Sequence, residues 1–307
     1  MTENALDPQL AVVILAAGQG TRMKSSLPKV LHRIGGRPLV GHVLDTARDL
    51  SPSQVVVVVR HERDQVADAV LGVAPEVIVA DQDEIPGTGR AVEVALDSLP
   101  GFAGDVLVLS GDVPLLDADT LTAFVAEHRA ADAGATLMTA ILDDPTGYGR
   151  IIRESDGSVA RIVEQKDASP EEASVTEVNA GMYVFSAAAL REHLPRVGTD
   201  NAQQEKYLTD IVALLRRAGG RVAASVAADV TVTYGVNDRV QLSDVGRLLN
   251  ARTVRRWQLE GVTVLDPATT WIDVTATLAP DVTVLPNTHI LRTTTIGEGA
   301  TVGPDTS

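Results

Sequence analysis

The chain has 307 residues, 45% of them hydrophobic and 22% charged, which is typical of a globular protein with one large and one smaller domain. Its formal charge of −15 argues against a polymeric nucleic acid as partner, because binding one needs a basic surface that displaces counterions. There is no cysteine, which excludes disulfides, thiolate metal sites and a cysteine nucleophile and fits a cytoplasmic location. The apolar run Ala11–Ala17 is too short to cross a bilayer, so no membrane partner is expected.

Short valine-rich runs alternate with amphipathic stretches through the first two-thirds of the chain. This alternation predicts an α/β fold, a Rossmann-like, mostly parallel sheet covered by helices on both faces. The predicted strands are Ala11–Ala17, Gln54–Arg60, Glu76–Asp81, Asp105–Ser110 and Ala135–Leu142, and the predicted helices are Leu39–Leu50, Glu62–Leu71, Thr88–Leu99 and Ala118–Ala131. Because such sheets bind ligands beyond the carboxyl ends of their strands, functional residues are expected directly after each strand.

A second block of strands and helices follows. The predicted strands are Arg161–Gln165, Val178–Phe185 and Arg221–Ala227, and a helix is expected over Tyr207–Ala218. A long helix then begins after Asn237 or Asp238, either of which could be its N-cap, and stops near Gly261. Its apolar residues form one stripe and the rest is polar and arginine-rich, which indicates a connecting arm.

Aliphatic residues recur at a strict six-residue spacing near the end of the chain: Ile272, Leu278, Val284, Ile290, Ile296 and Val302. This is the hexapeptide pattern of a parallel β-helix, in which each short face contributes one aliphatic side chain to a central stack. A few irregular strands are the alternative. Only about two coils fit before Ser307, so the pattern predicts a β-helix that is cut short or completed by a partner. The predicted parts are therefore residues 1–237, 238–261 and 262–307.

The segment Leu15–Lys29 directly follows the first predicted strand. Its small residues Ala16, Ala17, Gly18 and Gly20 let the backbone approach a ligand and direct N–H groups at phosphate oxygens. Two cations accompany them: Arg22 can grip phosphate with a planar fork, and Lys29 acts as a point charge. The segment therefore predicts a phosphate-binding loop, with an ordinary tight turn between strand and helix as the alternative.

Two well-known phosphate loops do not fit this segment. The dinucleotide fingerprint needs a third glycine where Met23 stands, and a P-loop needs a Gly-Lys-Ser/Thr sequence that is absent. The whole pattern G-x-G-T-R-M followed by P-K instead resembles the signature of sugar-nucleotide pyrophosphorylases.

Asp112 closes the sequence Ser-Gly-Asp after the strand that ends at Ser110, and Asn237 supplies a second oxygen far along the chain. Magnesium prefers oxygen ligands, often one or two from the protein with phosphates and waters completing its shell. These two residues are therefore the candidate Mg²⁺ ligands. A turn or helix cap is the alternative for Asp112, and the helix N-cap is the alternative for Asn237.

The candidate residues suit nucleotidyl transfer. In that reaction a sugar phosphate attacks the α-phosphorus of a nucleoside triphosphate and releases pyrophosphate. A phosphate monoester loses its second proton near pH 6, so the nucleophile is already charged and needs no general base. The remaining requirements are in-line positioning and charge neutralisation, for which Mg²⁺, Arg22, Lys29 and backbone N–H groups are the candidates.

Nine motifs in order resemble the bifunctional N-acetylglucosamine-1-phosphate uridylyltransferase/glucosamine-1-phosphate acetyltransferase family across nearly all of the chain. They are Leu15–Lys29, Gln82 with Gly87-Thr88-Gly89, Ser110–Asp112, Gly147–Ile151, Glu164–Asp167, Glu177–Gly181, Asn201–Asp210, Gly235–Asn237 and the hexapeptides. The resemblance implies a nucleotide-diphospho-sugar transferase fold with a left-handed β-helix. It also implies UTP and N-acetylglucosamine 1-phosphate as substrates, with Mg²⁺ as cofactor.

The resemblance further implies roles for individual residues. Arg22, Lys29 and Asp112 would be catalytic, and Asp112 and Asn237 would hold the metal. The nucleotide-binding residues would be Leu15, Ala16, Ala17, Gly18, Gly20, Thr21, Lys29, Gln82, Gly87 and Thr88. The sugar-binding residues would be Thr88, Gly149, Glu164 and Asn179. Gln82 suits uracil because a side-chain amide has one acceptor and two donors to match the N3–H and the carbonyls.

Some features depart from the family. Arg90 stands where the family often has histidine, and Ser110 stands where some members have tyrosine. The family's acetyltransferase residues lie in coils beyond Ser307, so acetyltransferase activity is expected to be absent from this chain. Members are homotrimers through the β-helix, and a chain with so short a β-helix is expected to be monomeric or weakly associated.

Two other functions stay open from the sequence alone. The first is transfer of uridylyl or thymidylyl to glucose 1-phosphate, since such relatives share the phosphate loop. The second is a non-catalytic, pyrophosphorylase-like regulatory subunit with hexapeptide coils. The presence of Arg22, Lys29, Asp112 and Asn237 disfavours the second, because a binding subunit need not keep these groups.

Overall fold

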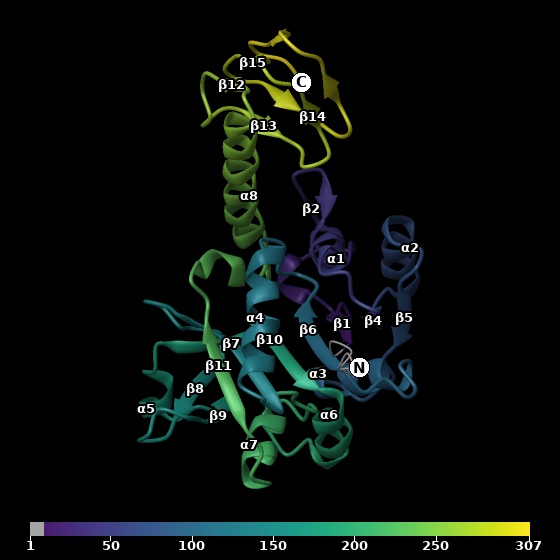
Figure 1. Ribbon diagram of the computed structural model, residues 1–307, viewed down its shortest axis with the longest axis vertical. Coiled ribbons are helices and arrows are strands. Elements are labelled where there is room, and N and C mark those ends of the chain that lie inside the picture. Colours follow the sequence, from purple (N-terminus) through teal and green to yellow (C-terminus); the bar gives the residue numbers. More distant parts are fainter. Residues whose placement is uncertain (1–8) are drawn as a thin grey trace, which may run out of the picture.

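The computed structural model describes residues 9–307, so residues 1–8 of the predicted first part lie outside the described range (Figure 1). Nine strands of these residues form one mixed sheet, whose main path runs β11-β7-β10-β6-β1-β4-β5. The strands are β1 (Leu10–Leu15), β4 (Gln54–Val59), β5 (Ile78–Asp81), β6 (Asp105–Ser110), β7 (Ala135–Ile141), β8 (Arg150–Arg153), β9 (Val159–Val163), β10 (Glu177–Ser186) and β11 (Val222–Val226). The predicted Rossmann-like sheet is therefore confirmed.

Parallel pairing joins β1 to β4 and β6, β4 to β5, and β7 to β11. The long strand β10 runs antiparallel to both β6 and β7, and it also pairs with β8 of the antiparallel β8–β9 hairpin. The sheet thus has a parallel half and a half that β10 makes antiparallel. This division determines how the two halves of the site are built.

Helices cover both faces of the sheet (Figure 1). They are α1 (Leu39–Asp49), α2 (Arg63–Val73), α3 (Thr88–Asp97), α4 (Ala118–Ala130), α5 (Pro170–Ala173), α6 (Ala187–His193) and α7 (Asp210–Arg217), with short 3₁₀ turns at Thr21–Met23, Lys29–Leu31, Leu194–Arg196 and Val230–Thr233. Successive residues of β1 point to opposite faces, so Val13 joins the core under α3, α6 and α7, while Val12 and Ile14 join the core under α1, α2 and α4. Both cores exclude water, which explains the continuous apolar runs.

Two details of the second block differ from the prediction. The strand expected at Arg161–Gln165 is β9 and ends at Val163, and its partner β8 was not predicted. Helix α7 begins at Asp210 and not at Tyr207, because the preceding backbone bonds elsewhere: Lys206 N–H donates to the Pro86 carbonyl, and Leu208 N–H donates to Thr88 Oγ1.

The long helix α8 (Arg239–Leu259) connects the sheet to the C-terminal coil (Figure 1). Its N-cap is Asp238, whose carboxylate accepts from Gln241 N–H at 2.8 Å. A small antiparallel hairpin of β2 (Arg33–Ile34) and β3 (Arg37–Pro38) packs beside α8, and the Gly35 carbonyl accepts from Val274 N–H of the coil at 3.0 Å. None of the helices in residues 9–307 combines the length and apolarity that crossing a bilayer needs.

The hexapeptide segment forms the predicted parallel β-helix stub. Its strands are β12 (Thr263–Val264), β13 (Trp271–Ile272), β14 (Thr277–Leu278), β15 (Thr283–Val284), β16 (His289–Ile290), β17 (Thr295–Ile296) and β18 (Thr301–Val302), which pair in parallel one coil apart. Ile272, Leu278, Val284 and Ile290 are buried in the stack, where Val254 and Trp257 of α8 join them. Burying these aliphatic side chains holds the coil on the end of α8.

Candidate active site

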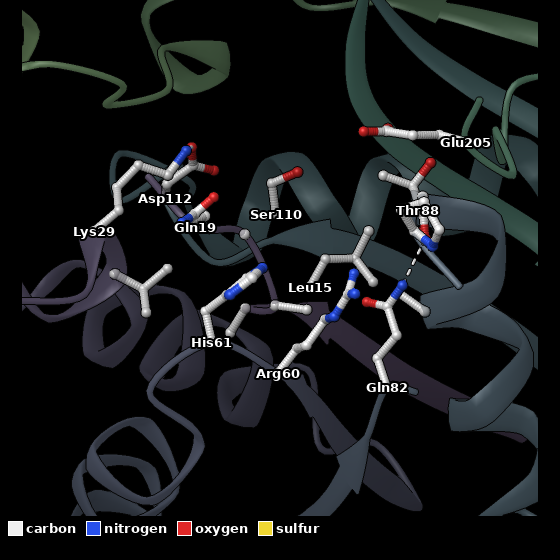
Figure 2. Close-up of a pocket in the computed structure, with 17 residues that line it drawn as sticks. Leu15, Gln19, Lys29, Arg60, His61, Gln82, Thr88, Ser110, Asp112 and Glu205 are labelled. Atoms are coloured by element: carbon white, nitrogen blue, oxygen red, sulfur yellow. Dashed lines mark hydrogen bonds and ion pairs between the residues drawn. The ribbon is translucent and has the colours of Figure 1, made fainter. Parts of the chain in front are cut away.

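A cleft of about 500 Å³ opens at the carboxyl ends of β1, β4, β5 and β6 (Figure 2). Most of the residues predicted to bind nucleotide line it: Leu15, Ala16, Ala17, Gly18, Lys29, Gln82, Gly87 and Thr88. The catalytic candidate Asp112 lines it too, whereas Gly20, Thr21 and Arg22 do not. The location follows from the sheet, because parallel strands bring their carboxyl ends to one edge.

The loop after β1 is shaped by close packing against Lys29. Gly20 has a φ of 64°, and a Cβ there would lie 2.6 Å from Lys29 Cβ, so only glycine fits. Gly18 has open space where a Cβ would stand, which leaves its backbone accessible to a ligand. Met23, in place of a third glycine, is buried against Leu39 and Val245. The methionine therefore anchors the end of the loop to the base of α8.

Four side chains from distant segments meet at one end of the cleft. Lys29 Nζ lies 2.5 Å from Asp112 Oδ2 and donates to Asn237 Oδ1 at 3.2 Å. Arg22 NH2 donates to the same Asn237 oxygen at 2.8 Å. Asp112 and Asn237 therefore present their oxygens to a single cation, the Lys29 ammonium, and Arg22 adds a second positive charge beside it.

The backbone explains why Asn237 is available for this cluster. Asp238 caps α8, so the Asn237 side chain has no capping role. The neighbouring Val236 N–H donates to the Asp112 carbonyl at 2.9 Å, which fixes the two segments against each other. Of the two roles open to Asn237 from the sequence, N-cap or site residue, the structure excludes the first.

The oxygen pair suits a hard cation that takes few protein ligands. Asp112 and Asn237 already converge on one positive charge, which is the donor arrangement a metal ion needs. No group of three or more His, Cys, Asp or Glu side chains capable of holding a metal occurs in residues 9–307. This donor set fits Mg²⁺, which is commonly held by one or two protein oxygens together with phosphates and water.

Gln82 forms the opposite end of the cleft, and its orientation is fixed (Figure 2). Its Nε2 donates to the carbonyls of Ile85 at 2.9 Å and Gly87 at 3.1 Å, so both amide N–H groups are in use. Only Oε1 remains to face a ligand. The expectation that Gln82 offers two donors to uracil is therefore wrong, because the loop consumes them.

The residues predicted to bind sugar, other than Thr88, do not line the 500 Å³ cleft: Gly149 directly precedes β8, Glu164 directly follows β9, and Asn179 lies on β10. Asn179 N–H donates to the Gly149 carbonyl at 2.8 Å, and a Cβ on Gly149 would lie 3.4 Å from Glu164 Oε2. Glu164 accepts from Thr209 Oγ1 at 3.2 Å. Burial raises the pKa of the Glu164 carboxyl, and the nearby acids Asp167, Asp210 and Glu205 raise it further.

These sugar-side residues adjoin the cleft through Ser110. The register of β10 shifts between Asn179 and Tyr183, and Gly181 adopts a φ of 73° there. A Cβ on Gly181 would lie 3.6 Å from Ser110 Oγ, and Ser110 lines the cleft. The bulge thus brings the Asn179 segment next to the cleft, while Asn179 Nδ2 donates to Tyr183 Oη at 2.6 Å.

The sequence missed several lining residues. They are Gln19, Val30, Arg60, His61, Pro86, Ala91 and Glu205. His61 directly follows the strand predicted at Gln54–Arg60, so the rule of searching after each strand could have found it. Arg60 follows β4 in the structure but was predicted to lie within that strand. Glu205 could not be found that way, because the pairing of Lys206 with Pro86 brings it to the cleft.

One solved structure with a similar fold is a putative glucose-1-phosphate thymidylyltransferase from Bacillus anthracis in complex with a sucrose. It superimposes with a TM-score of 0.61 at 18% identity, covering 78% of this chain and 94% of that one. At this identity the similarity shows the fold alone. The chain thus has a nucleotidyltransferase-like α/β fold, with its small-residue loop after β1 and its cleft at the strand ends.

Residues 12–207 match the MobA-like NTP transferase domain, and the chain belongs to that family. It is 63% identical over 301 residues to the protein named Bifunctional protein GlmU of Clavibacter sepedonicus, and 57% identical over 296 residues to that of Leifsonia xyli subsp. xyli. These matches cover 98% and 96% of this chain but 61% of each relative. The resemblance predicted from the motifs is confirmed by these matches.

Proposed function

We propose that the protein transfers uridylyl from UTP to N-acetyl-α-D-glucosamine 1-phosphate, giving UDP-N-acetylglucosamine and pyrophosphate, with Mg²⁺ as cofactor. The observation that carries the proposal is the meeting of Arg22, Lys29, Asp112 and Asn237 at one end of the strand-end cleft. Two cations and two oxygens so placed suit a triphosphate with its metal. The name shared by the relatives supports the same enzyme type.

The nucleotide would lie along the cleft. The accessible backbone at Gly18 would face its phosphates, and Gln82 Oε1 would accept from the N3–H of uracil. Arg22 and Lys29 would then compensate the phosphate charge. When bound, Mg²⁺ would supply further positive charge at the phosphate oxygens, held by Asp112 and Asn237.

The acceptor would lie toward β8–β10. Glu164 can accept from sugar hydroxyls, and Asn179 and Thr88 can bind hydroxyls or the acetamide. An oxygen of the sugar phosphate would form a bond to the α-phosphorus while the bond from that phosphorus to the β-phosphate bridging oxygen breaks. Pyrophosphate leaves with the electron pair. The attacking oxygen is already ionised at neutral pH, so the role of the protein is alignment and charge compensation.

The direct test measures pyrophosphate release by the purified protein with UTP, Mg²⁺ and either N-acetylglucosamine 1-phosphate or glucose 1-phosphate. The proposal predicts turnover that needs the metal and prefers the N-acetylated sugar. A preference for glucose 1-phosphate would refute the assigned acceptor, and no release with any sugar phosphate would refute the enzyme. Sedimentation of the same preparation would test the predicted monomeric or weakly associated state.

A further inference from the structure

A row of charged side chains lies beside α3, near the end of the cleft that Gln82 forms. Arg90 Nε lies 3.2 and 3.1 Å from the two carboxylate oxygens of Asp83, and its NH2 lies 2.7 Å from Oδ2. Arg90 NH1 also donates to Glu93 Oε2 at 2.6 Å. Lys206 Nζ donates to both carboxylate oxygens of Glu93, to Oε1 at 2.9 Å and to Oε2 at 3.0 Å. Two cations and two carboxylates thus alternate from Asp83 to Lys206.

One end of this row holds Gln82 through the backbone. Asp83 Oδ1, fixed by Arg90, accepts from Ile85 N–H at 3.1 Å. The Ile85 carbonyl in turn accepts from Gln82 Nε2 at 2.9 Å. The path from the Arg90 guanidinium to the Gln82 amide is therefore continuous, with one carboxylate and one backbone residue between them.

The other end is fixed by a buried lysine. Lys206 is only 9% exposed, and its backbone pairs with the same loop: its N–H donates to the Pro86 carbonyl at 2.9 Å, and its carbonyl accepts from Gly89 N–H at 2.7 Å. Gly87 has a φ of 114°, and a Cβ there would lie 2.3 Å from the Lys206 carbonyl oxygen. The loop that carries Gln82 is thus held at both ends.

We infer that Arg90 is a positioning residue for base recognition: through Asp83 and Ile85 it holds Gln82 with its oxygen toward the cleft. The inference rests on the proposed nucleotide site. A flipped Gln82 amide would lose both hydrogen bonds and place its oxygen against two carbonyl oxygens. The fixed orientation offers an acceptor and no donor, so it suits a base with N–H at the facing edge.

The fixed Gln82 amide would discriminate between uracil and cytosine. The N3 atom of uracil carries a proton that Gln82 Oε1 can accept, whereas N3 of cytosine is an acceptor that would face the same oxygen unpaired. A site rejects an analogue when binding it leaves buried polar atoms without hydrogen bonds, here Gln82 Oε1 and N3 of cytosine. If the Arg90 clamp is loosened, Gln82 can turn its NH₂ toward the cleft and accommodate cytosine.

The experiment measures the dissociation constants of UTP and CTP by calorimetry with Mg²⁺ and no sugar phosphate. The wild-type protein is expected to prefer UTP, and R90Q is expected to lower the UTP-to-CTP preference about tenfold, the value of roughly one hydrogen bond. R90K keeps the charge but cannot bind Asp83 with two donors, so it should recover part of the preference. D83N loosens the same clamp from its exposed end and serves if R90Q does not fold.

The matched control is R153Q. It removes another bidentate arginine–carboxylate pair, between Arg153 on β8 and Glu177 on β10. It should leave the preference unchanged. An unchanged preference in R90Q and D83N, or an equal fall in R153Q, overturns the inference, as does a wild-type protein that binds neither nucleotide. Turnover with sugar phosphate is measured separately: if it is absent while the binding preference behaves as expected, the proposed function fails and the role of Arg90 stands.

Discussion

The proposed nucleotide half and the proposed acceptor half of the site are built in different ways. The nucleotide half consists of segments that follow β1, β4, β5 and β6, whose carboxyl ends meet at one edge of the sheet. The acceptor half lies on antiparallel strands, where a register shift in β10 places Asn179 next to the cleft. Most of the first half follows from strand order, except Asn237, which lies just before α8. The second depends on where one strand departs from regular pairing.

The two halves also differ in charge compensation. In the proposed nucleotide half the Lys29 ammonium lies beside both Asp112 Oδ2 and Asn237 Oδ1. In the proposed acceptor half the carboxyl of Glu164 is half-buried, accepts from the hydroxyl of Thr209 and lies near the acids Asp167, Asp210 and Glu205. The proposed nucleotide half is therefore charge-compensated without a ligand, whereas in the proposed acceptor half a sugar hydroxyl would stabilise the Glu164 carboxylate.

The largest effect is expected for D112A. Removing the carboxylate leaves the Lys29 ammonium without its charged partner and removes one of two candidate metal ligands. Turnover of UTP with N-acetylglucosamine 1-phosphate should fall about a thousandfold, several kcal/mol in activation free energy. Steady-state rates over a Mg²⁺ titration provide the measurement. D119A, which removes an exposed aspartate nearby on α4, is the control; near-normal rates in D112A would show that the metal assignment is wrong.

Lys29 should be the next most sensitive position. K29A removes the positive charge that lies closest to the candidate metal ligands, and kcat should fall about a hundredfold through loss of transition-state charge compensation. Single-turnover rates at saturating substrates separate this loss from weaker binding. An effect on sugar affinity alone would contradict the division of the site into two halves.

E164Q is expected to change catalysis less than K29A does, and to raise stability at pH 7. The amide accepts hydrogen bonds less strongly than a carboxylate, so KM for the sugar phosphate should rise about tenfold while KM for UTP changes little. The exposed E171Q on α5 is the control. A parallel rise in both KM values would mean that Glu164 does not act on the acceptor alone.

The pH dependence of stability follows from the same residue. Burial raises the pKa of Glu164 above its ordinary value of 4.5, so the folded state holds the proton more tightly than the unfolded state. Its stabilising contribution is therefore full below pH 4.5 and is lost as pH rises through the raised pKa. E164Q should therefore unfold at a higher temperature than wild type at pH 7, and this difference in unfolding temperature should be smaller at pH 4. Thermal unfolding curves at the two pH values check the sign.

Strand-end geometry explains how much of the fold and of the nucleotide half could be predicted. The strand at Asp105–Ser110 and the loop from Leu15 to Lys29 have local signals, apolar runs followed by small and charged residues. The start of α7 was predicted three residues too early, because Lys206 and Leu208 bond to the loop before α3 and not within a helix. That choice depends on a segment more than a hundred residues away, and no local pattern reports it.

The same limit applies within the site. Motifs could select the four residues of the cluster, Arg22, Lys29, Asp112 and Asn237. They could not predict that Lys29 bridges Asp112 and Asn237. The orientation of Gln82 was also out of reach, because it depends on carbonyls that the fold of the loop turns inward. Composition and spacing identify which groups are present; tertiary pairing decides which of their donors remain free.

The smallest effect is expected at Asp238, next to a residue that should matter much more. Asp238 caps α8 by accepting from Gln241 N–H, so D238A should cost about 1 kcal/mol of stability and change turnover less than about twofold. N237A should instead lower turnover strongly and change stability little. The Asn237 side-chain oxygen accepts from Lys29 and Arg22 and does not cap the helix. Chemical denaturation and steady-state kinetics on both variants separate the two roles. If D238A abolished turnover while N237A did not, the oxygen that completes the nucleotide half would belong to Asp238, and the cluster described at the cleft would have to be reassigned.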